Sequence, residues 1–295
     1  MKEKLPIPDD YAFHWSFLAL NNDEMNFESS RIVVLPVPYD STTSYRSGAK
    51  EGPSAIIEAS RYLEDYDLEL DCEISDVGIY TLPELDPNVD GPYKMTERVK
   101  NVSKAIFESG KILAMLGGEH SITPGCIAPF TKKYKKLCLL HFDAHADLRE
   151  SYNGEKFSHA SAIRRCLDYK NVSVISFGIR NISQSETLYL KKNSSRIKIF
   201  WAKDKVKWNL NKFKKMIKNK TVYLTFDVDG LDSSIMPATG TPEPGGLFWD
   251  ETLKIIKIAA KNSKIVGADI NELSPIKGFN SYKDRKSTRL NSSHW

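Results

Sequence analysis

The sequence predicts an α/β fold in which a mostly parallel sheet carries helices on both faces. Short apolar runs alternate along the chain with segments whose apolar residues recur every three or four positions. One run, 137–140, is apolar at every position, which is typical of a strand buried on both faces of a parallel sheet. Strands that alternate with helices in this way form βαβ units. With 295 residues, 41 % of them hydrophobic, the chain can bury a large core.

The first strand follows a polar segment. Residues 1–30 are mixed in character, and we expect an N-terminal arm that lies on the body or on a neighbouring subunit. Residues 32–37 (IVVLPV) predict the first strand. The next segment, 38–53, is rich in Ser, Thr, Gly and Tyr and predicts a long loop, a kind of segment that is usually functional or disordered in compact domains. Pro53 then begins a helix that ends near residue 63.

The remaining elements alternate along the chain to residue 270. We predict further strands over 77–80, 112–116, 136–142, 172–177, 197–201, 223–227 and 265–270. We predict further helices over 96–109, 123–134, 158–167, 186–192 and 249–260. Gly110 ends the first of these helices. A loop rich in Pro, Gly and Thr spans 237–246.

Residues 203–220 contain eight lysines. Their apolar residues predict one solvated helix with Asp204 as its N-cap and a single stripe formed by Val206, Leu210, Phe213 and Ile217. A basic patch that binds anions is the less favoured interpretation, because lysines are ordinary on the outer face of a helix.

Composition argues against several classes of protein. A net charge of +4 gives no case for a nucleic-acid partner. The four cysteines have no C-x-x-C spacing, which favours free thiols in a reducing compartment. The first residues, MKEKLPIPDDY, lack the apolar core of a signal peptide, and no run of 18 apolar residues predicts a membrane span. We therefore expect a soluble, cytoplasmic protein.

The stretch LLHFDAHADL (139–148) predicts a metal site. It begins as a buried strand and then places Asp143, His145 and Asp147 at every second position. In an extended backbone alternate side chains point to the same face, so these three should converge at the end of the strand. Carboxylates with imidazole suit a divalent ion such as Mn, Zn or Fe.

Two further strands end in similar residues. Asp227 and Asp229 follow the apolar run 222–224, and Gly-Gly-Glu-His (117–120) follows the run 112–116. Sites in open α/β sheets gather at the carboxyl ends of strands. Three strands that end in ligand-type residues therefore strengthen the prediction of a metal centre.

Four motifs together resemble the ureohydrolases, the arginase/agmatinase family. They are GGEHSIT (117–123), HFDAHADL (141–148), TFDVDGLD (225–232) and ADINELSP (268–275), and they stand in the family's order. The resemblance runs from about residue 32 to about residue 282 and implies a three-layer α/β/α sandwich, an arginase-like fold. It also implies a homo-oligomer and a centre of two metal ions per chain, usually Mn²⁺. One ion would be held by His120, Asp143, Asp147 and Asp227, and the other by Asp143, His145, Asp227 and Asp229.

The resemblance also implies roles for residues around the metal ions. His159, in FSHAS, matches the histidine that carries a proton to the leaving amine, and Glu272, in NELSP, matches the glutamate that pairs with the substrate guanidinium. The alternative for His159 is a structural role at the start of a helix. Asp232 would orient the site from outside the ligand shell, and His141 is expected to be structural support.

The segments around residues 148–161 and 239–247 resemble agmatinases. Arg149 stands where arginases have the asparagine that binds the substrate's α-carboxylate. We therefore expect agmatine to be hydrolysed to putrescine and urea. The alternatives are aminopropyl-agmatine, a guanidino acid or arginine as substrate, or a catalytically idle member that acts as a binding partner. Thr225 and Ser233 replace the commoner serine and proline, and we expect neither to touch a ligand.

The last residues differ from the rest. Residues 284–294 (DRKSTRLNSSH) look like a translated sequencing adapter, and we expect 284–295 to be non-native. The ureohydrolase domain would then span 31–283 and lack the C-terminal helix that follows the ELSP segment in the family. His294 is not counted as a ligand.

Overall fold

The computed structural model describes residues 15–20 and 26–276. An eight-stranded sheet forms the centre, and all of its strand pairs are parallel, which confirms the predicted α/β fold. Across the sheet the order is β4 (Ile79–Thr81), β1 (Ile32–Val37), β5 (Ile112–Gly117), β10 (Lys264–Asn271), β9 (Thr221–Asp227), β6 (Leu137–Phe142), β7 (Val172–Phe177) and β8 (Ile197–Phe200).

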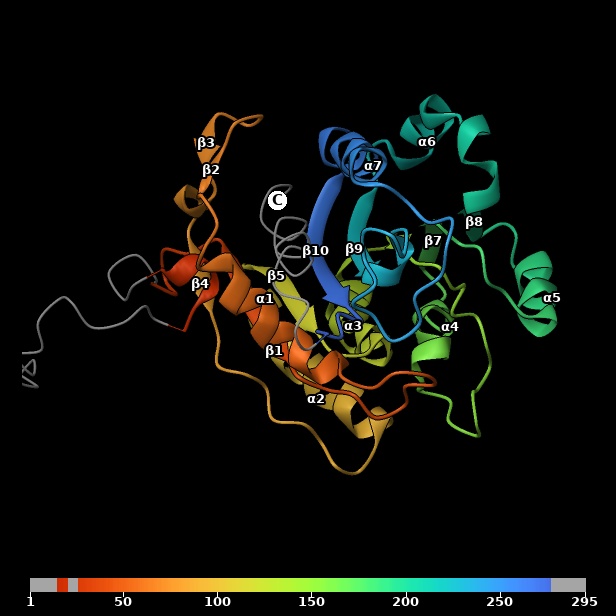
Figure 1. Ribbon diagram of the computed structural model, residues 1–295, viewed down its shortest axis with the longest axis horizontal. Coiled ribbons are helices and arrows are strands. Elements are labelled where there is room, and N and C mark those ends of the chain that lie inside the picture. The colour runs from red at the N-terminus through yellow and green to blue at the C-terminus, as the bar shows by residue number, and fades with distance from the viewer. Residues whose placement is uncertain (1–14, 21–25, 277–295) are drawn as a thin grey trace, which may run out of the picture.

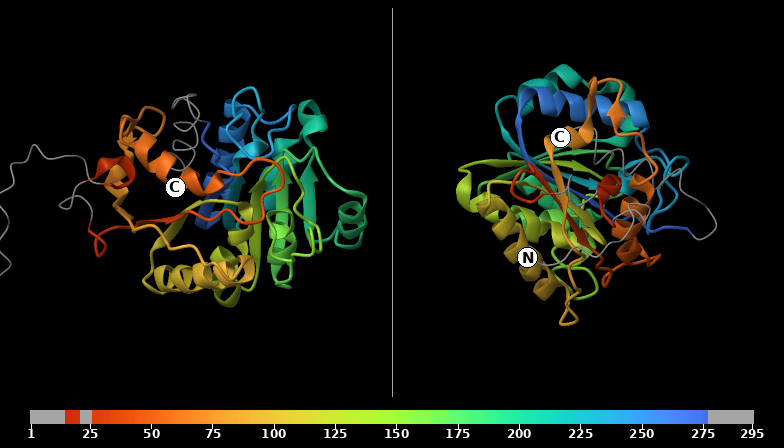
Figure 2. Two further views of the ribbon diagram at one scale, coloured as in Figure 1. Left: turned by 60° about the horizontal axis from the view of Figure 1, so that its bottom comes forward. Right: turned by 90° about the vertical axis from the view of Figure 1, so that its left-hand side faces the viewer.

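Helices cover both faces of the sheet and give three layers (Figures 1 and 2). One face packs against α2 (Pro92–Glu108), α3 (Thr123–Lys133), α4 (Ala162–Leu167) and α5 (Gln184–Lys192). The other face packs against α1 (Gly52–Ser60), α6 (Leu210–Ile217) and α7 (Trp249–Asn262).

Alternate residues of each strand point to opposite faces of the sheet and join two hydrophobic cores, one on each face. In β1, Val33 and Leu35 join the core under α2 and α3, whereas Ile32 and Val34 join the core under α1 and α7. All six residues of β1 are buried. This double burial explains why the strands read as unbroken apolar runs in the sequence.

The described part of the N-terminal arm packs on the body. Phe17 is buried, and its backbone N–H donates to Thr81 Oγ1 at 3.0 Å. The Leu18 N–H donates to Ser60 Oγ, at the end of α1. Residues 1–14 and the predicted non-native segment 284–295 lie outside the described residues, as does the expected absence of a C-terminal helix.

The prediction of one helix over the lysine-rich segment is wrong. A short 3₁₀ segment, Ala202–Lys207, is followed by α6, and Asn209 rather than Asp204 is the N-cap, because its side chain accepts from the Lys212 N–H at 3.0 Å. Val206 is 99 % exposed and lies off the apolar stripe. Residues 208 and 209 are extended, so the helical phase assumed from Val206 to Leu210 is broken.

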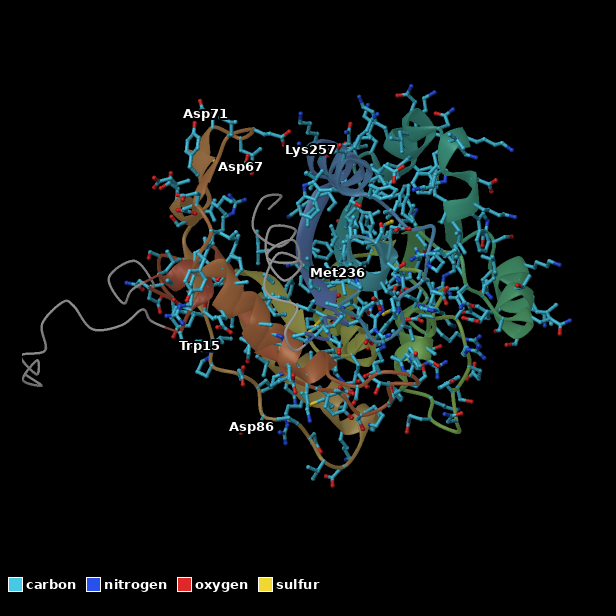
Figure 3. All side chains as sticks on the ribbon, in the orientation of Figure 1. Trp15, Asp67, Asp71, Asp86, Met236 and Lys257 are labelled. Atoms are coloured by element: carbon cyan, nitrogen blue, oxygen red, sulfur yellow. The ribbon has the colours of Figure 1, made fainter. Side chains whose placement is uncertain are left out.

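A small antiparallel hairpin was not predicted. Its strands, β2 (Tyr66–Asp67) and β3 (Cys72–Glu73), project from the body beside α7 (Figures 1 and 3). Lys257 of α7 pairs with Glu69 at the hairpin tip. The strands are too short and too exposed to produce an apolar pattern, which is why the sequence carries no signal for them.

The cysteines and the apolar character of the helices were also subjects of prediction. All four cysteines lie there as free thiols, with Cys72 exposed and the other three buried. Within 15–20 and 26–276, no helix combines the length and apolar character needed to span a membrane.

The four strands that carry the sequence motifs are neighbours. β5, β10, β9 and β6 lie side by side at the centre of the sheet, so their carboxyl ends open at one place. Gly118, just after β5, lies so close to the Tyr39 carbonyl that a Cβ at this position would clash with it. The close approach brings the loop after β1 to the same edge.

Candidate metal centre

The residues after β6 converge, but not through an extended backbone. β6 ends at Phe142, the chain bends at Ala144, and Asp147 has a positive φ of 51°. After β9, residues 228–230 form a 3₁₀ turn that places Asp229. The predicted convergence of these acids is therefore correct, but the two-residue periodicity offered as its cause is wrong, because both strands end before the second acid.

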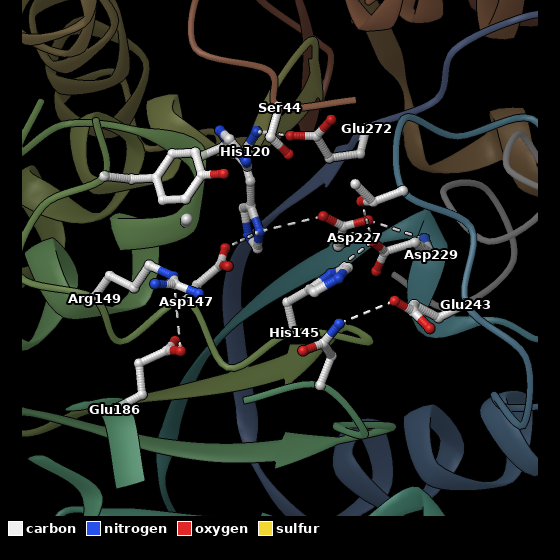
Figure 4. Close-up of a pocket in the computed structure, with 15 residues that line it drawn as sticks. Ser44, His120, His145, Asp147, Arg149, Glu186, Asp227, Asp229, Glu243 and Glu272 are labelled. Carbon is white, nitrogen blue, oxygen red and sulfur yellow. Dashed lines mark hydrogen bonds and ion pairs between the residues drawn. The ribbon is translucent and has the colours of Figure 1, made fainter. Parts of the chain in front are cut away.

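His120 faces three carboxylates, and Figure 4 shows two of them, Asp147 and Asp227. Its Nδ1 lies 3.3 Å from Asp143 Oδ2, 3.1 Å from Asp147 Oδ2 and 3.6 Å from Asp227 Oδ2. Although it is buried, this nitrogen makes no hydrogen bond of acceptable geometry. A buried imidazole nitrogen that has no hydrogen bond and faces three carboxylate oxygens resembles part of a ligand shell.

A buried chain of hydrogen bonds determines which nitrogen of His120 carries the proton. Thr225 Oγ1 donates to Asp269 Oδ1 at 2.6 Å and lies 2.8 Å from His120 Nε2. Because the single hydroxyl proton of Thr225 is directed to Asp269, Nε2 is the donor to Thr225, and in the neutral ring the lone pair is on Nδ1, which faces the cluster. The expectation that Thr225 touches no predicted ligand is therefore wrong. Thr225 and Asp269 hold His120 in the tautomer that a metal requires.

Asp143 joins the two histidines of the cluster. Besides its contact with His120, its Oδ1 lies 3.5 Å from His145 Nδ1, and His145 Nδ1 lies 2.9 Å from Asp229 Oδ2. The atoms of Asp143, His145 and Asp229 are close enough together to hold an ion. The same carboxylate thus faces both halves of the predicted centre.

His141 holds Asp143 in place. Its Nε2 lies 2.9 Å from Asp143 Oδ2, and its Nδ1 lies 3.0 Å from Ser176 Oγ. His141, His120 and Asp143 also form a group compact enough for a metal. Because both nitrogens of His141 already have partners in the protein, the geometry favours the predicted role of support over that of ligand.

Sequence reasoning missed Arg180, which shapes the turn after β9. Its guanidinium donates to the carbonyl oxygens of Asp229 (2.8 Å), Leu231 (3.2 Å) and Glu243 (2.7 Å). The sequence around Arg180 gave little indication of this role, because Arg180 follows an ordinary apolar strand and its partners are backbone carbonyl oxygens rather than side chains. Asp232 also acts on this turn: its Oδ2 accepts from the N–H groups of Gly245 and Gly246 and so fixes the loop 243–246.

The electrostatics of the cluster fit a bound cation. Burial lowers the pKa of His145, but Asp229 and Asp143 outweigh it and raise that pKa to about 12. Burial and then the charge of Asp143 raise the pKa of Asp147 to about 7, and burial together with Asp229 raises the pKa of Asp227. The positive charges of His120 and His145 therefore offset the buried negative charge only in part, and divalent ions bound there would supply the rest.

Glu272 lies over the cluster from the end of β10. It is buried, with a positive φ of 67°, and its Oε1 accepts from the His120 backbone N–H at 2.7 Å. Burial, followed by the charge of Glu119, raises the pKa of Glu272. Asp147 and Glu272 thus both have strained backbone at the site, which the surrounding packing must maintain.

His159 is held by the loop after β1, which is the long loop predicted over residues 38–53. Thr42 Oγ1 lies 3.1 Å from His159 Nδ1 and 2.9 Å from Glu119 Oε1, and it accepts from the His159 backbone N–H. Burial and then the charges of His145 and His120 lower the pKa of His159 to about 4, so the ring is neutral. Glu119 is buried and also accepts from the N–H groups of Ser41 and Thr42.

A cavity of about 230 Å³ lies over these residues and suits a small molecule. His120, His145, Asp147, Asp227 and Asp229 line it together with His159 and Glu272. Asp143 lies beneath the lining and is fully buried. On the outer side, Arg149 Nε lies 3.9 Å from Glu186 Oε2, and the Arg149 guanidinium lies 5.3 Å from the Tyr152 ring centre.

Comparisons with known proteins agree with this geometry. A model described as the arginase family matches residues 30–291. The chain is 35 % identical over 263 residues to an N(1)-aminopropylagmatine ureohydrolase of Synechocystis, covering 86 % of this chain and 84 % of that protein. It is 35 % identical over 253 residues to an agmatinase of Bacillus anthracis, covering 85 % and 86 %. The crystal structure of a putative agmatinase from Clostridium difficile superposes with a TM-score of 0.81 at 33 % identity, over 90 % of this chain and 95 % of that one.

Proposed function

Because the chain belongs to the arginase family, we propose that it is a metal-dependent hydrolase that cleaves the guanidinium group of agmatine, giving putrescine and urea. The observation that carries this proposal is the convergence of His120 Nδ1 with three carboxylate oxygens at the floor of a small cavity. The relatives support the guanidino substrate.

Six residues would hold two divalent ions. His120, Asp143, Asp147 and Asp227 would bind one, and Asp143, His145, Asp227 and Asp229 the other. Divalent ions bound there lower the pKa of water towards neutrality and so supply hydroxide for attack on a guanidinium carbon. Thr225 and His141 hold His120 and Asp143 in orientation for this purpose.

Glu272 would orient the substrate. A guanidinium is planar and cationic, and it pairs with a carboxylate through two parallel hydrogen bonds. The His120 N–H occupies one lone pair of Glu272 Oε1, which leaves acceptor sites on both oxygens. The pairing would place the guanidinium carbon over the ligand cluster.

His159 would deliver a proton to the departing amine, since an amine anion cannot leave. Thr42 Oγ1 donates to Glu119, so His159 Nδ1 is the donor to Thr42, and Nε2 is the nitrogen that remains for the substrate. A ring that rests neutral can take up a proton and pass it on.

The hydroxyl of Thr42 should therefore matter to the rate. We expect Thr42→Val to lower kcat roughly 10- to 100-fold with a smaller change in KM, because an unanchored His159 ring samples other orientations and tautomers. Thr42→Ser should stay near the wild type, since it restores the hydroxyl. Steady-state urea release measures both.

Thr43→Val is the matched control. Thr43 neighbours Thr42 in the loop, and its hydroxyl bonds to Asp40 Oδ1 instead of to the site. If Thr43→Val lowers kcat as much as Thr42→Val does, the effect belongs to the loop as a whole, and the anchoring role of Thr42 is wrong.

Urea release tests the function directly. The purified protein is stripped with a chelator, reloaded with Mn²⁺, Zn²⁺ or Fe²⁺, and given agmatine, N(1)-aminopropylagmatine, arginine or 4-guanidinobutyrate. We expect the Mn²⁺ form to release urea fastest from agmatine. N(1)-aminopropylagmatine is the second candidate, because relatives of that name match at the same 35 % identity. Faster turnover of arginine, or no urea with two ions bound, would contradict the proposal.

Manganese, a homo-oligomer and a cytoplasmic location complete the proposal. Carboxylate and imidazole ligands support manganese. Four free thiols support a reducing compartment. Sedimentation velocity of the metal-loaded protein tests the homo-oligomer, which a monomer at micromolar concentration would contradict.

A further inference from the structure

The outer wall of the cavity carries three charged side chains apart from the proposed ligands, His159 and Glu272. They are Arg149, Glu186 and Glu243. Since a guanidino substrate enters with its guanidinium towards the metal cluster, these three face the other end of the molecule. A cationic tail needs an anion with an unused acceptor atom, so the two carboxylates decide whether the cavity accepts one.

Neither Arg149 nor Glu186 offers an acceptor to a cationic tail, because Arg149 has only donors and both oxygens of Glu186 already accept hydrogen bonds. Glu186 Oε1 accepts from the Leu148 N–H at 3.0 Å, and its Oε2 accepts from the Ser183 N–H at 2.8 Å and the Ser183 hydroxyl at 2.6 Å. Arg149 lies 3.9 Å from the same Oε2. The pair is close to neutral together, and the carboxylate serves as a cap for α5.

Glu243 is different. Its Oε1 accepts from Asn181 Nδ2 at 2.9 Å, whereas its Oε2 has neither a hydrogen bond nor an ion pair among the residues that the structure describes. Figure 4 shows this carboxylate beside Asp229 and His145, at the side of the cavity away from Arg149. It is half-buried, so a cation that reached it would be partly shielded from water.

The backbone of Glu243 is held rigidly. Arg180 donates to the carbonyl oxygens of Glu243 (2.7 Å) and Pro244 (3.0 Å), and Asp232 accepts from the next two N–H groups. The Asn181 side chain orients the Glu243 carboxylate, and the backbone of Asn181 forms an isolated β-bridge with that of His145. A carboxylate held in this way is preorganised for a ligand and loses little freedom on binding.

We propose that Glu243 receives the terminal ammonium of the substrate through Oε2 and so selects guanidino compounds with a cationic tail. This inference rests on the proposed function and deepens it. A carboxylate and an ammonium form a charge-assisted hydrogen bond, whereas a tail that ends in a carboxylate would be repelled.

The test compares agmatine with 1-butylguanidine, which has the same guanidinium and chain but no terminal ammonium. We expect Glu243→Gln to raise KM for agmatine roughly 10- to 100-fold with kcat little changed, because the amide nitrogen that replaces Oε2 is a donor and cannot accept from the ammonium. The kcat/KM for 1-butylguanidine should stay within about twofold, as it contains no group for Glu243 to bind. Glutamine keeps an acceptor for Asn181, so the loop should be retained.

Asp250→Asn is the charge control, because it removes one negative charge from an exposed site outside the cavity. Equal losses for both compounds in Glu243→Gln would show a structural role, and no loss for either would show that Glu243 does not bind the tail. Each of these results overturns the inference.

Direct binding separates the inference from the proposed function. Calorimetry on the metal-loaded His159→Asn protein should show agmatine binding roughly 10- to 100-fold more tightly than 1-butylguanidine, an advantage that Glu243→Gln removes. If the wild type binds agmatine in this way but releases no urea, the proposed reaction is wrong and the inference stands. If agmatine binds no more tightly than 1-butylguanidine, the inference is wrong even where urea is released.

Discussion

Replacing Asp143 with asparagine is expected to remove the metal ions and to lower urea release by roughly 10³-fold or more. Asp143 faces His120 through Oδ2 and His145 through Oδ1, so it serves both halves of the centre. Asparagine has nearly the same shape but cannot supply the negative charge. Metal ions stabilise the transition state by several kcal/mol, and each 1.36 kcal/mol of activation free energy changes the rate tenfold.

Metal content and urea release should fall together in this variant. Inductively coupled plasma mass spectrometry of the dialysed protein measures the first, and a colorimetric assay the second. Asp168→Asn is the control, because it removes a carboxylate that pairs with Arg165 at the far end of α4. Two ions per chain and near-normal activity in Asp143→Asn would refute the bridging role.

Replacing His159 with asparagine is expected to lower kcat by about 10²- to 10⁴-fold, the usual contribution of a general acid or base. In contrast to Asp143→Asn, this variant should keep its full metal content, because His159 bonds to Thr42 rather than to any of the six proposed ligands. The two variants together separate loss of the centre from loss of proton transfer.

A rescue experiment strengthens the second prediction. Imidazole added to His159→Ala should restore part of the rate, since a small base can enter the space that the ring vacated. Near-normal kcat in His159→Asn would assign the histidine the structural role that was the alternative. A loss of metal ions in that variant would also contradict the proposed division of roles.

The strands were the most predictable part of the fold. Every residue of β1 and β6 is buried, as is every residue but one of β7 and of β9, so the apolar pattern of the sequence shows these strands directly. Short exposed elements were not predictable. The hairpin β2–β3 has no buried face, and the helical break before α6 depends on Asn209, whose capping role local spacing alone did not distinguish from that of Asp204.

The residues of the candidate metal centre also differ in how far the sequence alone could predict them. The acids and histidines after β5, β6 and β9 could be identified because each stands directly behind an apolar run. Arg180, Thr42 and Asp269 could not, because each acts on a partner that is distant in the sequence. Thr42 and His159 are separated by 117 positions, and Thr225 and Asp269 by 44.

By itself the sequence determined the order of strands and helices, the α/β class and the identity of the ligand-type residues, because burial pattern and residue chemistry are local properties. The tertiary structure decided which atoms meet. The sheet order β5-β10-β9-β6 brings Glu272 to the His120 N–H across 152 positions, and the turns after β6 and β9 aim Asp147 and Asp229 where an extended strand would not. Tautomers, unpartnered oxygens and strained backbone depend on such long-range contacts, and these exist only when the whole sheet has formed.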